Sequence, residues 1–359
     1  MTLQRSTRLA AALAAGSLAL AACGGSDGNA DEGSGLSGTI SGAGATSQAA
    51  AMEGWIAGFQ TANEQATVNY DAVGSGGGRE QFLEGGTAFA GSDAALDEDE
   101  LALAEERCGD GGLVEVPLYI SPIAVAFNLP GVETLNLSPE VLAGIFTQKI
   151  TTWDAPEIAA DNPDADLPST AITPVNRSDE SGTTENFTEY LAAVAPDVWT
   201  EEPSGEWPIA GGESGNGTSG VVQTITSSEG AIGYADASQV GDLGVAAVGV
   251  GDEFVELSPE AAAAVVEASP RVEGRPEGSL AIELARDTTE SGNYPIVLVS
   301  YSIACTTYED ANETELVRGF LEYAASEDGQ AAAAEAAGSA PLSDTLRTDA
   351  VAAIEQIGA

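Results

Sequence analysis

Residues 113–129 read LVEVPLYISPIAVAFNL and form the most apolar stretch of the chain after its first 22 residues. Pro117 and Pro122 interrupt the stretch, so it is unsuited to a membrane-spanning helix, which needs about 20 apolar residues in a row. It is also long for a single strand, because strands mostly contain about 3–10 residues. The stretch therefore predicts two strands joined near Pro122, as expected where a chain crosses from one lobe to another.

A second apolar stretch, residues 294–305 (YPIVLVSYSIAC), is rich in β-forming residues and predicts a return crossing. A chain of 359 residues is long enough for two domains with their own cores. Strand and helix signals alternate along the chain, which indicates an α/β fold. We therefore expect two α/β lobes, joined by crossings near residues 118–127 and 293–302. Lobe I would comprise residues 36–121 with 295–359, and lobe II residues 122–294.

Acidic residues greatly outnumber basic ones, with 57 Asp and Glu against 11 Lys and Arg and a net charge of −46. Nucleic acid and anionic membrane surfaces are bound through clustered cations, so we expect neither as a partner. The chain contains no histidine. This excludes Ser-His-Asp and Cys-His nucleophile systems and histidine-based metal sites, so any enzyme here would need carboxylates, Lys or Tyr to move protons. We expect a protein that is not an enzyme.

Neither a metal nor a cofactor is expected. Residues 161–166 (DNPDAD) resemble the start of a calcium-binding loop, but Asp166 stands where glycine is needed and Ile172 where the bidentate Glu is needed. We interpret this run as a solvated loop.

The first 22 residues have the pattern of an export signal. Arg5 and Arg8 precede an apolar run over residues 9–22, which is too short to span a bilayer as a helix. The run ends in LAAC, which looks like a bacterial lipobox and predicts lipidation of Cys23; a plain secretory signal with a chance cysteine is the alternative. Residues 23–35 then form a small, polar and acidic segment, typical of a flexible tether. We expect an exported protein, anchored to the outer face of the cell membrane through lipid only.

Cys108 and Cys305 are the two remaining cysteines. Because an exported chain meets an oxidising compartment, we expect these two residues to form a disulfide. Both fall in the predicted lobe I, as a disulfide requires.

Three turns rich in Gly, Ser and Thr precede segments with helical spacing. They are residues 42–47 (GAGATS), 74–78 (GSGGG) and 176–184 (NRSDESGTT). A helix start offers unpaired backbone N–H groups and a partial positive charge, and glycine lets the backbone approach a ligand closely. The first turn resembles a dinucleotide-binding fingerprint, but Ser47 stands at the third glycine position, so that site is not supported. A flexible surface loop is the alternative for the second turn, and an ordinary capped helix with a surface Arg is the alternative for the third. The helices are expected over residues 48–63, 79–83 and 185–194.

The third turn adds a fixed cation, Arg177, four residues before Ser181. Together with the hydroxyls of Ser181 and Thr183, this cation would form a pocket for a tetrahedral oxyanion. Asp93, in the run GSDA after a predicted strand, adds a carboxylate at a strand end; a turn or helix cap is its alternative role. Residues 215–220 (GNGTSG) match G-x-G-x-x-G, but no strand is expected before them. We interpret them as a helix entry and not as a dinucleotide site.

In their order, and over nearly the whole chain after the signal, these motifs resemble the phosphate-binding (PstS-type) proteins of bacterial phosphate ABC transporters. The resemblance implies a two-lobed periplasmic-binding-protein fold of type II, with the ligand in the cleft between the lobes. The matching stretches are residues 42–47 (GAGATS), 74–78 (GSGGG), 91–94 (GSDA), 149–153 (KITTW), 177–183 (RSDESGT), 207–208 (WP), 229–234 (EGAIGY) and 340–342 (APL).

The resemblance also implies a set of phosphate-binding residues. Asp93 would accept the proton of the phosphate, and Asp179 would orient Arg177 without touching the anion. The family often has Phe at the position of Ser47, where the backbone N–H binds, and Ser47 supplies the same N–H. The implied phosphate ligands are Thr46, Ser47, Ser75, Asp93, Arg177, Ser181, Gly182 and Thr183.

Asp93 makes a selectivity prediction on physical grounds. A carboxylate repels an anion unless that anion still carries a proton to donate. Hydrogen phosphate carries such a proton at neutral pH and sulfate does not, so Asp93 would admit phosphate and reject sulfate. Asp93 would not separate phosphate from arsenate in this way.

The implied function is extracytoplasmic, high-affinity binding of inorganic phosphate by a monomer that delivers it to the permease subunits of an ABC transporter. Three alternatives stay open at this point. They are a binding protein for another oxyanion such as arsenate, an exported phosphatase built on the same site, and a surface adhesin that uses the fold as a scaffold.

Overall fold

The apolar stretch at the centre of the chain forms one strand and not two. In a computed structural model that describes residues 35–359, β4 (Leu113–Phe127) is continuous and buried throughout. Up to Pro122 it pairs antiparallel with β12 (Val297–Cys305), and from Ile123 on it pairs with β8 (Ala231–Asp236). The expected break at Pro122 is therefore a change of partner strand, and the expectation of two strands is wrong. The predicted signal peptide, the lipidated Cys23 and most of the tether lie outside the described residues.

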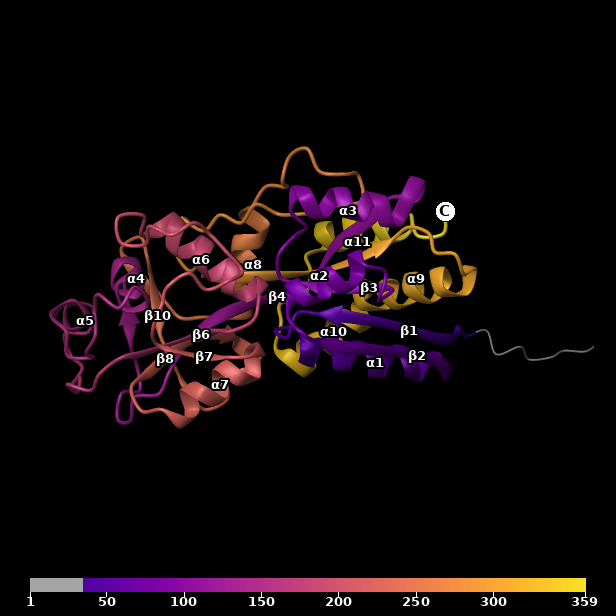
Figure 1. Cartoon of the computed structure of the whole chain (residues 1–359). Coiled ribbons are helices and arrows are strands. Elements are labelled where there is room, and N and C mark those ends of the chain that lie inside the picture. The colour runs from indigo at the N-terminus through magenta and orange to yellow at the C-terminus, as the bar shows by residue number, and fades with distance from the viewer. Residues whose placement is uncertain (1–34) are drawn as a thin grey trace, which may run out of the picture. The chain divides into compact units, whose positions relative to one another are not determined.

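The exchange of partners makes β4 the centre of a large mixed sheet. The strands follow in the order β2-β1-β3-β12-β4-β8-β6-β7, and β9 also pairs with β4. β1 (Ser37–Gly44) is parallel to β2 (Gln65–Ala72) and β3 (Phe89–Ser92). β6 (Thr173–Arg177) is likewise parallel to β7 (Glu213–Gly215) and β8. Figure 1 shows β4 between these two groups of parallel strands.

We call the group β1, β2 and β3, with the helices that follow these strands, the β1 side. The group β6, β7 and β8, with its helices, is the β6 side. Within each side the carboxyl ends of parallel strands meet at one edge, and each polar turn follows such an end. The expected lobe boundaries at residues 121 and 295 stay a prediction.

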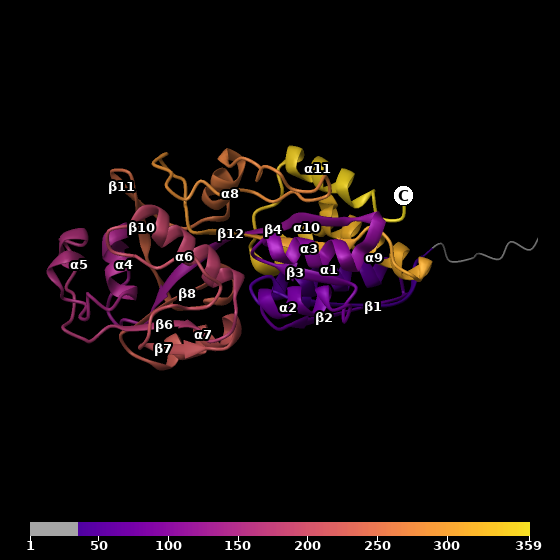
Figure 2. The same cartoon turned by 45° about the horizontal axis from the view of Figure 1, so that its top comes forward.

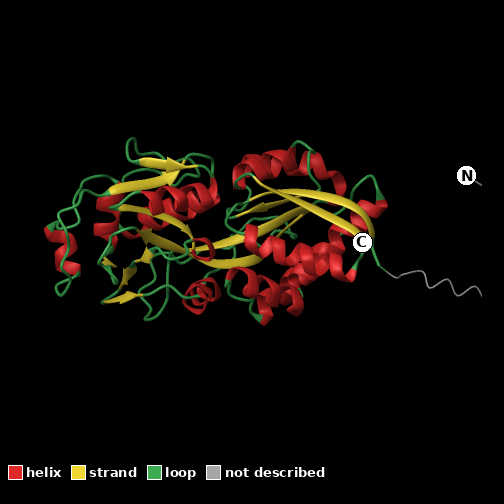
Figure 3. Cartoon of the chain, turned by 90° about the horizontal axis from the view of Figure 1, so that it is seen from below, coloured by secondary structure: helices red, strands yellow, loops and turns green. Residues whose placement is uncertain are grey.

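The expected units of strand, turn and helix at residues 42–63 and 176–194 are confirmed, although Gly42–Gly44 belong to the strand and the second helix begins at Gly182 and not at residue 185. On the β1 side, α1 (Ala49–Ala62) follows β1, α2 (Ser75–Leu83) follows β2, and α3 (Glu98–Cys108) follows β3. On the β6 side, α6 (Gly182–Val194) follows β6 and α7 (Gly217–Ser227) follows β7. Helices cover both faces of the β1-side strands (Figure 3).

Two local expectations need correction. α2 begins at Ser75 and not at Arg79, because the glycines after Gly74 form the first helical turn instead of a loop. A Cβ on Gly78 would lie 2.3 Å from Gly44 Cα, so only glycine lets this turn pack on β1. The GNGTSG run does follow a strand, β7, which is three residues long and too short to show an apolar alternation.

Aromatic side chains fill the core on both sides. The predicted apolar face of α1 is confirmed: Trp55 and Phe59 are buried, and Phe59 meets Phe320 edge to face at 5.5 Å. On the β6 side, Phe187 of α6 stacks on Tyr234 of β8 at 4.4 Å. These contacts pack α1 against a second helix of its side and α6 against β8.

The predicted disulfide between Cys108 and Cys305 is confirmed, with a Cα–Cα distance of 5.2 Å. It joins the end of α3 to the end of β12. Among residues 35–359, no helix is both long and apolar enough to cross a membrane.

A smaller sheet of β11, β10 and β5 lies beside α4, because Gly249 of β10 approaches Pro139 at the start of α4. Figure 2 shows β10 and β11 next to α4. The remaining elements are η1 (Gly109–Gly111), β5 (Asn136–Leu137), α4 (Pro139–Phe146), α5 (Pro156–Asp161), η2 (Ala237–Gln239), β9 (Gly244–Val245), β10 (Ala247–Val250), β11 (Glu253–Val255), α8 (Pro259–Ala268), α9 (Ala311–Ala325), α10 (Glu327–Ala337) and α11 (Asp344–Ile354).

Candidate functional site

Four helix starts lie close to one another where the β1 side faces the β6 side. The starts of α1 and α2 belong to the β1 side, and those of α6 and α7 to the β6 side. Side-chain contacts described below join them in pairs. Each start carries unpaired backbone N–H groups and a partial positive charge, so their convergence favours an anion.

Asp93 lies at the centre of these contacts. It directly follows β3, and the residue is only 3% exposed. Ser47 Oγ lies 2.7 Å from both carboxylate oxygens, and Thr183 Oγ1 donates to Oδ2 at 2.8 Å. Ser300 Oγ of β12 donates to Oδ1. A buried carboxylate thus accepts hydroxyl hydrogens from three elements, which offsets part of the cost of its burial.

The backbone of Asp93 also takes part in the arrangement. Its N–H donates to Ser75 Oγ at 3.1 Å, and its C=O accepts from Asn186 Nδ2 at 2.8 Å. Ser75 begins α2 and Asn186 lies in α6. The end of β3, which carries Asp93, is therefore held by α2 of the β1 side and by α6 of the β6 side.

Arg177 and Asp179 form a tight pair at the end of β6. Arg177 is 3% exposed, and its Nε donates to Asp179 Oδ1 at 2.8 Å while Nη2 donates to Oδ2. Gly217 N–H, at the start of α7, also donates to Asp179 Oδ1 at 3.0 Å. Burial alone would raise the pKa of Asp179, but the hydrogen bonds and the charge of Arg177, together with the Gly217 N–H, lower the pKa below its ordinary value. Asp179 thus stays ionised and fixes the plane of the guanidinium.

The start of α6 contributes three predicted residues, which are Ser181, Gly182 and the Thr183 described above. Ser181 caps the helix, because its Oγ accepts from the Thr184 N–H at 3.2 Å. Gly182 lies so close to the β1 side that a Cβ there would stand 2.7 Å from Ser75 Oγ and 2.8 Å from Asp93 Cβ. The glycine in the SGT motif is therefore required by a close approach across the sheet.

Thr46 faces the start of α7. Its Oγ1 lies 2.9 Å from Thr218 Oγ1, and it accepts from the Thr218 N–H at 3.1 Å. Gln239 Nε2 donates to the carbonyl oxygens of Thr46 and Ser47, at 2.8 and 3.1 Å. The predicted residues from the two sides are thus brought together, with Thr46 opposite a residue that the sequence analysis did not single out.

Two residues of this arrangement, Thr218 and Ser300, were not predicted from the sequence. Thr218 lies in the GNGTSG run, whose reading as a helix entry could have suggested one more anion-facing helix start. Ser300 lies inside the apolar run of β12, where Ser302 is also buried and no local signal tells the two serines apart.

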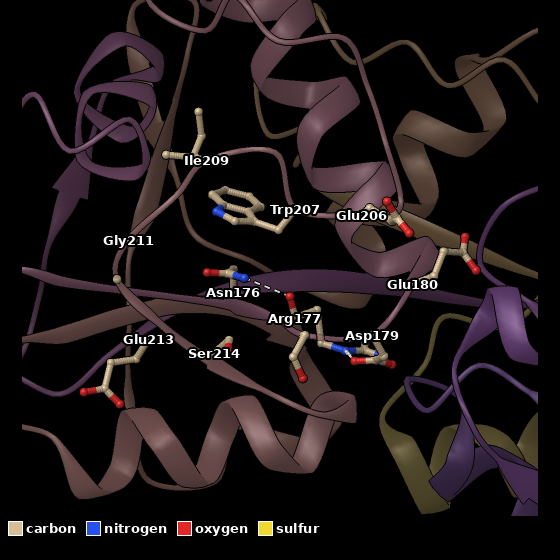
Figure 4. Close-up of a pocket in the computed structure, with 12 residues that line it drawn as sticks. Asn176, Arg177, Asp179, Glu180, Glu206, Trp207, Ile209, Gly211, Glu213 and Ser214 are labelled. Carbon is tan, nitrogen blue, oxygen red and sulfur yellow. Dashed lines mark hydrogen bonds and ion pairs between the residues drawn. The ribbon is translucent and has the colours of Figure 1, made fainter.

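A pocket of about 350 Å³ opens next to the predicted anion loop, on the β6 side (Figure 4). Arg177, Asp179 and Glu180 line one part of it, and Trp207 lines another. No residue of the β1 side lines this pocket. It is therefore a neighbour of the place where the helix starts meet and not the same space.

The arrangement can hold a small anion without a large net positive charge. Asp179 balances Arg177, so the helix starts and hydroxyl hydrogens provide the attraction. In the part of the chain that the structure describes, Arg177 Nη1 has no hydrogen-bond partner and remains available for a ligand. The Ser75 and Ser181 oxygens accept backbone N–H groups, and both hydroxyl hydrogens remain free to donate.

Comparison with known proteins points to one family. Residues 29–328 match PBP_like_2, a PBP superfamily domain. The phosphate-binding protein PstS2 of Mycobacterium bovis is 36% identical over 381 residues, which cover 99% of this chain and 100% of the relative. The phosphate-binding protein PstS 3 of Mycobacterium tuberculosis is 35% identical over 344 residues, covering 90% and 91%. A solved structure of a high affinity periplasmic phosphate-binding protein (PfluDING) bound with phosphate has a TM-score of 0.72 and 26% identity, covering 88% of this chain and 93% of that one.

Proposed function

The chain belongs to the PBP superfamily and, within it, to the PstS phosphate-binding proteins, and from this premise we propose that it binds inorganic phosphate with high affinity outside the cytoplasm. It delivers the phosphate to the permease subunits of an ABC transporter. The fold is the two-lobed α/β periplasmic-binding fold of type II. The chain acts as a binding protein and not as an enzyme.

The observation that carries the proposal is the position of Asp93. A buried carboxylate stands among hydroxyl donors and helix starts that attract an anion. An anion without a proton would face direct repulsion there, whereas hydrogen phosphate donates its proton to the carboxylate. In this proposal, the phosphate is contacted by the residues that the family resemblance implies, and Asp179 holds Arg177 in place. The contacting residues are Thr46, Ser47, Ser75, Asp93, Arg177, Ser181, Gly182 and Thr183.

Binding couples to the approach of the two sides. The contacts of Thr183 with Asp93 and of Thr46 with Thr218 join the β6 side to the β1 side around the proposed site. A phosphate held by both sides favours the arrangement in which they lie close together, and phosphate leaves when they separate. β4 and β12 provide the hinge, because both strands run through the middle of the sheet.

The proposal includes attachment to the membrane. The lipobox places a lipidated Cys23 at the start of the exported chain, and residues 24–35 link the lipid to β1. The protein then works as a monomer at the outer face of the cell membrane. Labelled palmitate that enters the wild-type chain but not Cys23→Ser in a bacterial host would support the anchor, and equal labelling would refute it.

Calorimetric titration with phosphate, arsenate and sulfate tests the binding function. The wild-type chain is expected to bind phosphate and ignore sulfate. In Asp93→Asn the amide also offers donors, so discrimination against sulfate should weaken by at least tenfold. The matched control is Asp252→Asn, which removes the same charge from an exposed turn between β10 and β11.

Two results would refute the proposal. One is a wild-type chain that gives no heat with phosphate, which favours the adhesin alternative. The other is an Asp93→Asn variant that still ignores sulfate, which removes the role assigned to this carboxylate. Hydrolysis of p-nitrophenyl phosphate by the purified chain would favour the phosphatase alternative.

A further inference from the structure

The second glycine turn makes contacts that the anion site does not explain. α2 begins with Ser75, and only this residue of the turn belongs to the proposed phosphate ligands. A Cβ on Gly76 would stand 0.9 Å from Glu180 Oε2, a carboxylate oxygen of the β6 side. A Cβ on Gly74 would stand 2.8 Å from Asp179 Oδ2. These two glycines therefore make room for acidic side chains of the opposite side and not for the anion.

Arg79, one turn further along α2, binds the same acidic side chain. Its Nη2 donates to Glu180 Oε1 at 2.9 Å. Its other two nitrogens bind on the β1 side, where Nε donates to Glu100 Oε1 at 2.7 Å and Nη1 to Ser92 Oγ at 3.0 Å. The guanidinium is thus anchored to the β1 side and offers one donor group to the β6 side.

The position of Glu180 favours this contact electrostatically. Its carboxylate lies over the first turn of α2, where the helix carries a partial positive charge. The side chain of Arg79 is 9% exposed and that of Glu180 is 33% exposed, so the pair is partly shielded from water. The charges of Glu180 and Glu100 raise the pKa of Arg79 against the effect of its burial. An arginine side chain keeps its proton in proteins, so the guanidinium stays charged whether or not the two sides are in contact.

Glu180 is adjacent in sequence to the anion loop. It stands between Asp179, which holds Arg177, and Ser181, which caps α6. A movement that brings the loop to the anion therefore brings the Glu180 carboxylate onto Gly76 and Arg79. The two events happen together because three consecutive residues cannot move independently.

We propose that the Arg79–Glu180 ion pair determines the affinity for the ligand, because it holds the two sides together around the ligand without touching it. Gly76 leaves the space that the Glu180 carboxylate occupies. The inference rests on the proposed phosphate binding and deepens it. Because the contact forms only when the sides meet, its loss speeds phosphate release and leaves capture nearly unchanged. Both residues are thus positioning residues for the bound state.

The test compares two neighbouring glycines of the same helix. Gly76→Ala places a methyl group where the Glu180 carboxylate lies. Gly77→Ala, the matched control, places a methyl group that meets only the Val73 side chain of its own side, at 3.2 Å. Glu180→Gln removes the charge and keeps the shape. Phosphate affinity is measured by calorimetry and release by stopped-flow, and each ligand-free variant is checked by thermal unfolding.

Gly76→Ala and Glu180→Gln are expected to raise the release rate and the dissociation constant by roughly 3- to 10-fold, while Gly77→Ala matches the wild type. Gly76→Ala should add nothing in a Glu180→Ala background, because the side chain that meets the new methyl group is then absent. Unchanged release in Gly76→Ala and Glu180→Gln would overturn the inference, as would equal effects of Gly76→Ala and Gly77→Ala.

Small-angle scattering with saturating phosphate separates this inference from the proposed function. On binding phosphate the wild type should contract more than Glu180→Gln, and equal contraction would count against the ion pair. A wild-type chain that binds no phosphate would instead overturn the proposed function.

Discussion

Gly182→Ala tests whether phosphate binding requires the two sides of the sheet to approach as closely as the structure shows. The added methyl group would lie 2.7 Å from Ser75 Oγ, 2.8 Å from Asp93 Cβ and 2.9 Å from Ala94 N. Ordinary carbon contacts begin near 3.4 Å, so the sides must part by about half an ångström or more at this point. Two of the three contacts are made by Cβ and backbone atoms, which cannot rotate away. The clash therefore acts on the distance between the sides and not on a side-chain conformation.

The expected size of the effect follows from the cost of overpacking. Extra volume in a tightly packed contact costs about 1–3 kcal/mol. Since about 1.4 kcal/mol corresponds to a tenfold change, the dissociation constant for phosphate should rise by roughly 5- to 150-fold. When the sides are apart, the methyl group meets nothing opposite, and alanine is the better helix former by up to about 1 kcal/mol. The ligand-free chain should therefore keep or slightly raise its melting temperature.

Calorimetry with phosphate and thermal unfolding without it provide the assay, with Gly77→Ala as the control for a new methyl group in a first helical turn. Wild-type affinity in Gly182→Ala would show that the close approach is not part of the bound state. A ligand-free chain that melts well below the wild type would show that the clash acts on folding. Either result refutes the reasoning.

Three further perturbations have defined outcomes. Replacing Cys108 and Cys305 by Ser opens a loop with a sequence separation of 197, which should cost up to about 5 kcal/mol of unfolding free energy in urea titrations; a wild type insensitive to reductant would contradict this. Burial raises the pKa of Glu185 from 4.5 to about 7, against the pull of Arg79 and with help from neighbouring carboxylates. The folded chain then holds a proton that the unfolded chain loses, so stability should fall as pH rises from 4.5 to about 7, by at most roughly 3 kcal/mol; Glu185→Gln should flatten this dependence, and an unchanged pH profile of urea unfolding would refute it. Thr218→Val removes the hydroxyl that faces Thr46 at 2.9 Å and should weaken phosphate binding roughly fivefold in calorimetry, whereas equal affinity would place this pair outside the site.

Local patterns predicted much of the architecture. The apolar spacing of Met52, Trp55 and Phe59 predicted α1, since one buried face imposes a helical period on the sequence. The pairing of Cys108 with Cys305 followed from cysteine count and export. For residues 113–129 the position of the change was predicted correctly but its nature was not. The strand does not end at Pro122; it changes its partner strand there. A strand continues through such a point when a new neighbour takes over the hydrogen bonding.

The glycines of the second turn show where local reasoning reached its limit. The number of glycines indicated that some group approaches the backbone closely, and such close approaches are found at Gly76 and Gly78. The identity of that group was not accessible, because Gly78 meets the backbone of Gly44 and Gly76 meets Glu180 from the opposite side.

The sequence by itself determined which residue types stand at each strand end and helix start, because turn chemistry and hydrophobic period act over a few neighbouring residues. It thereby predicted the anion loop, the strand-end carboxylate and the α/β class. Only the tertiary structure decided which of these groups meet. Ser300 reaches Asp93 across a separation of 207 residues, and Thr218 reaches Thr46 across 172. Such contacts depend on the order in which strands join the sheet, and no local period in the sequence encodes that order.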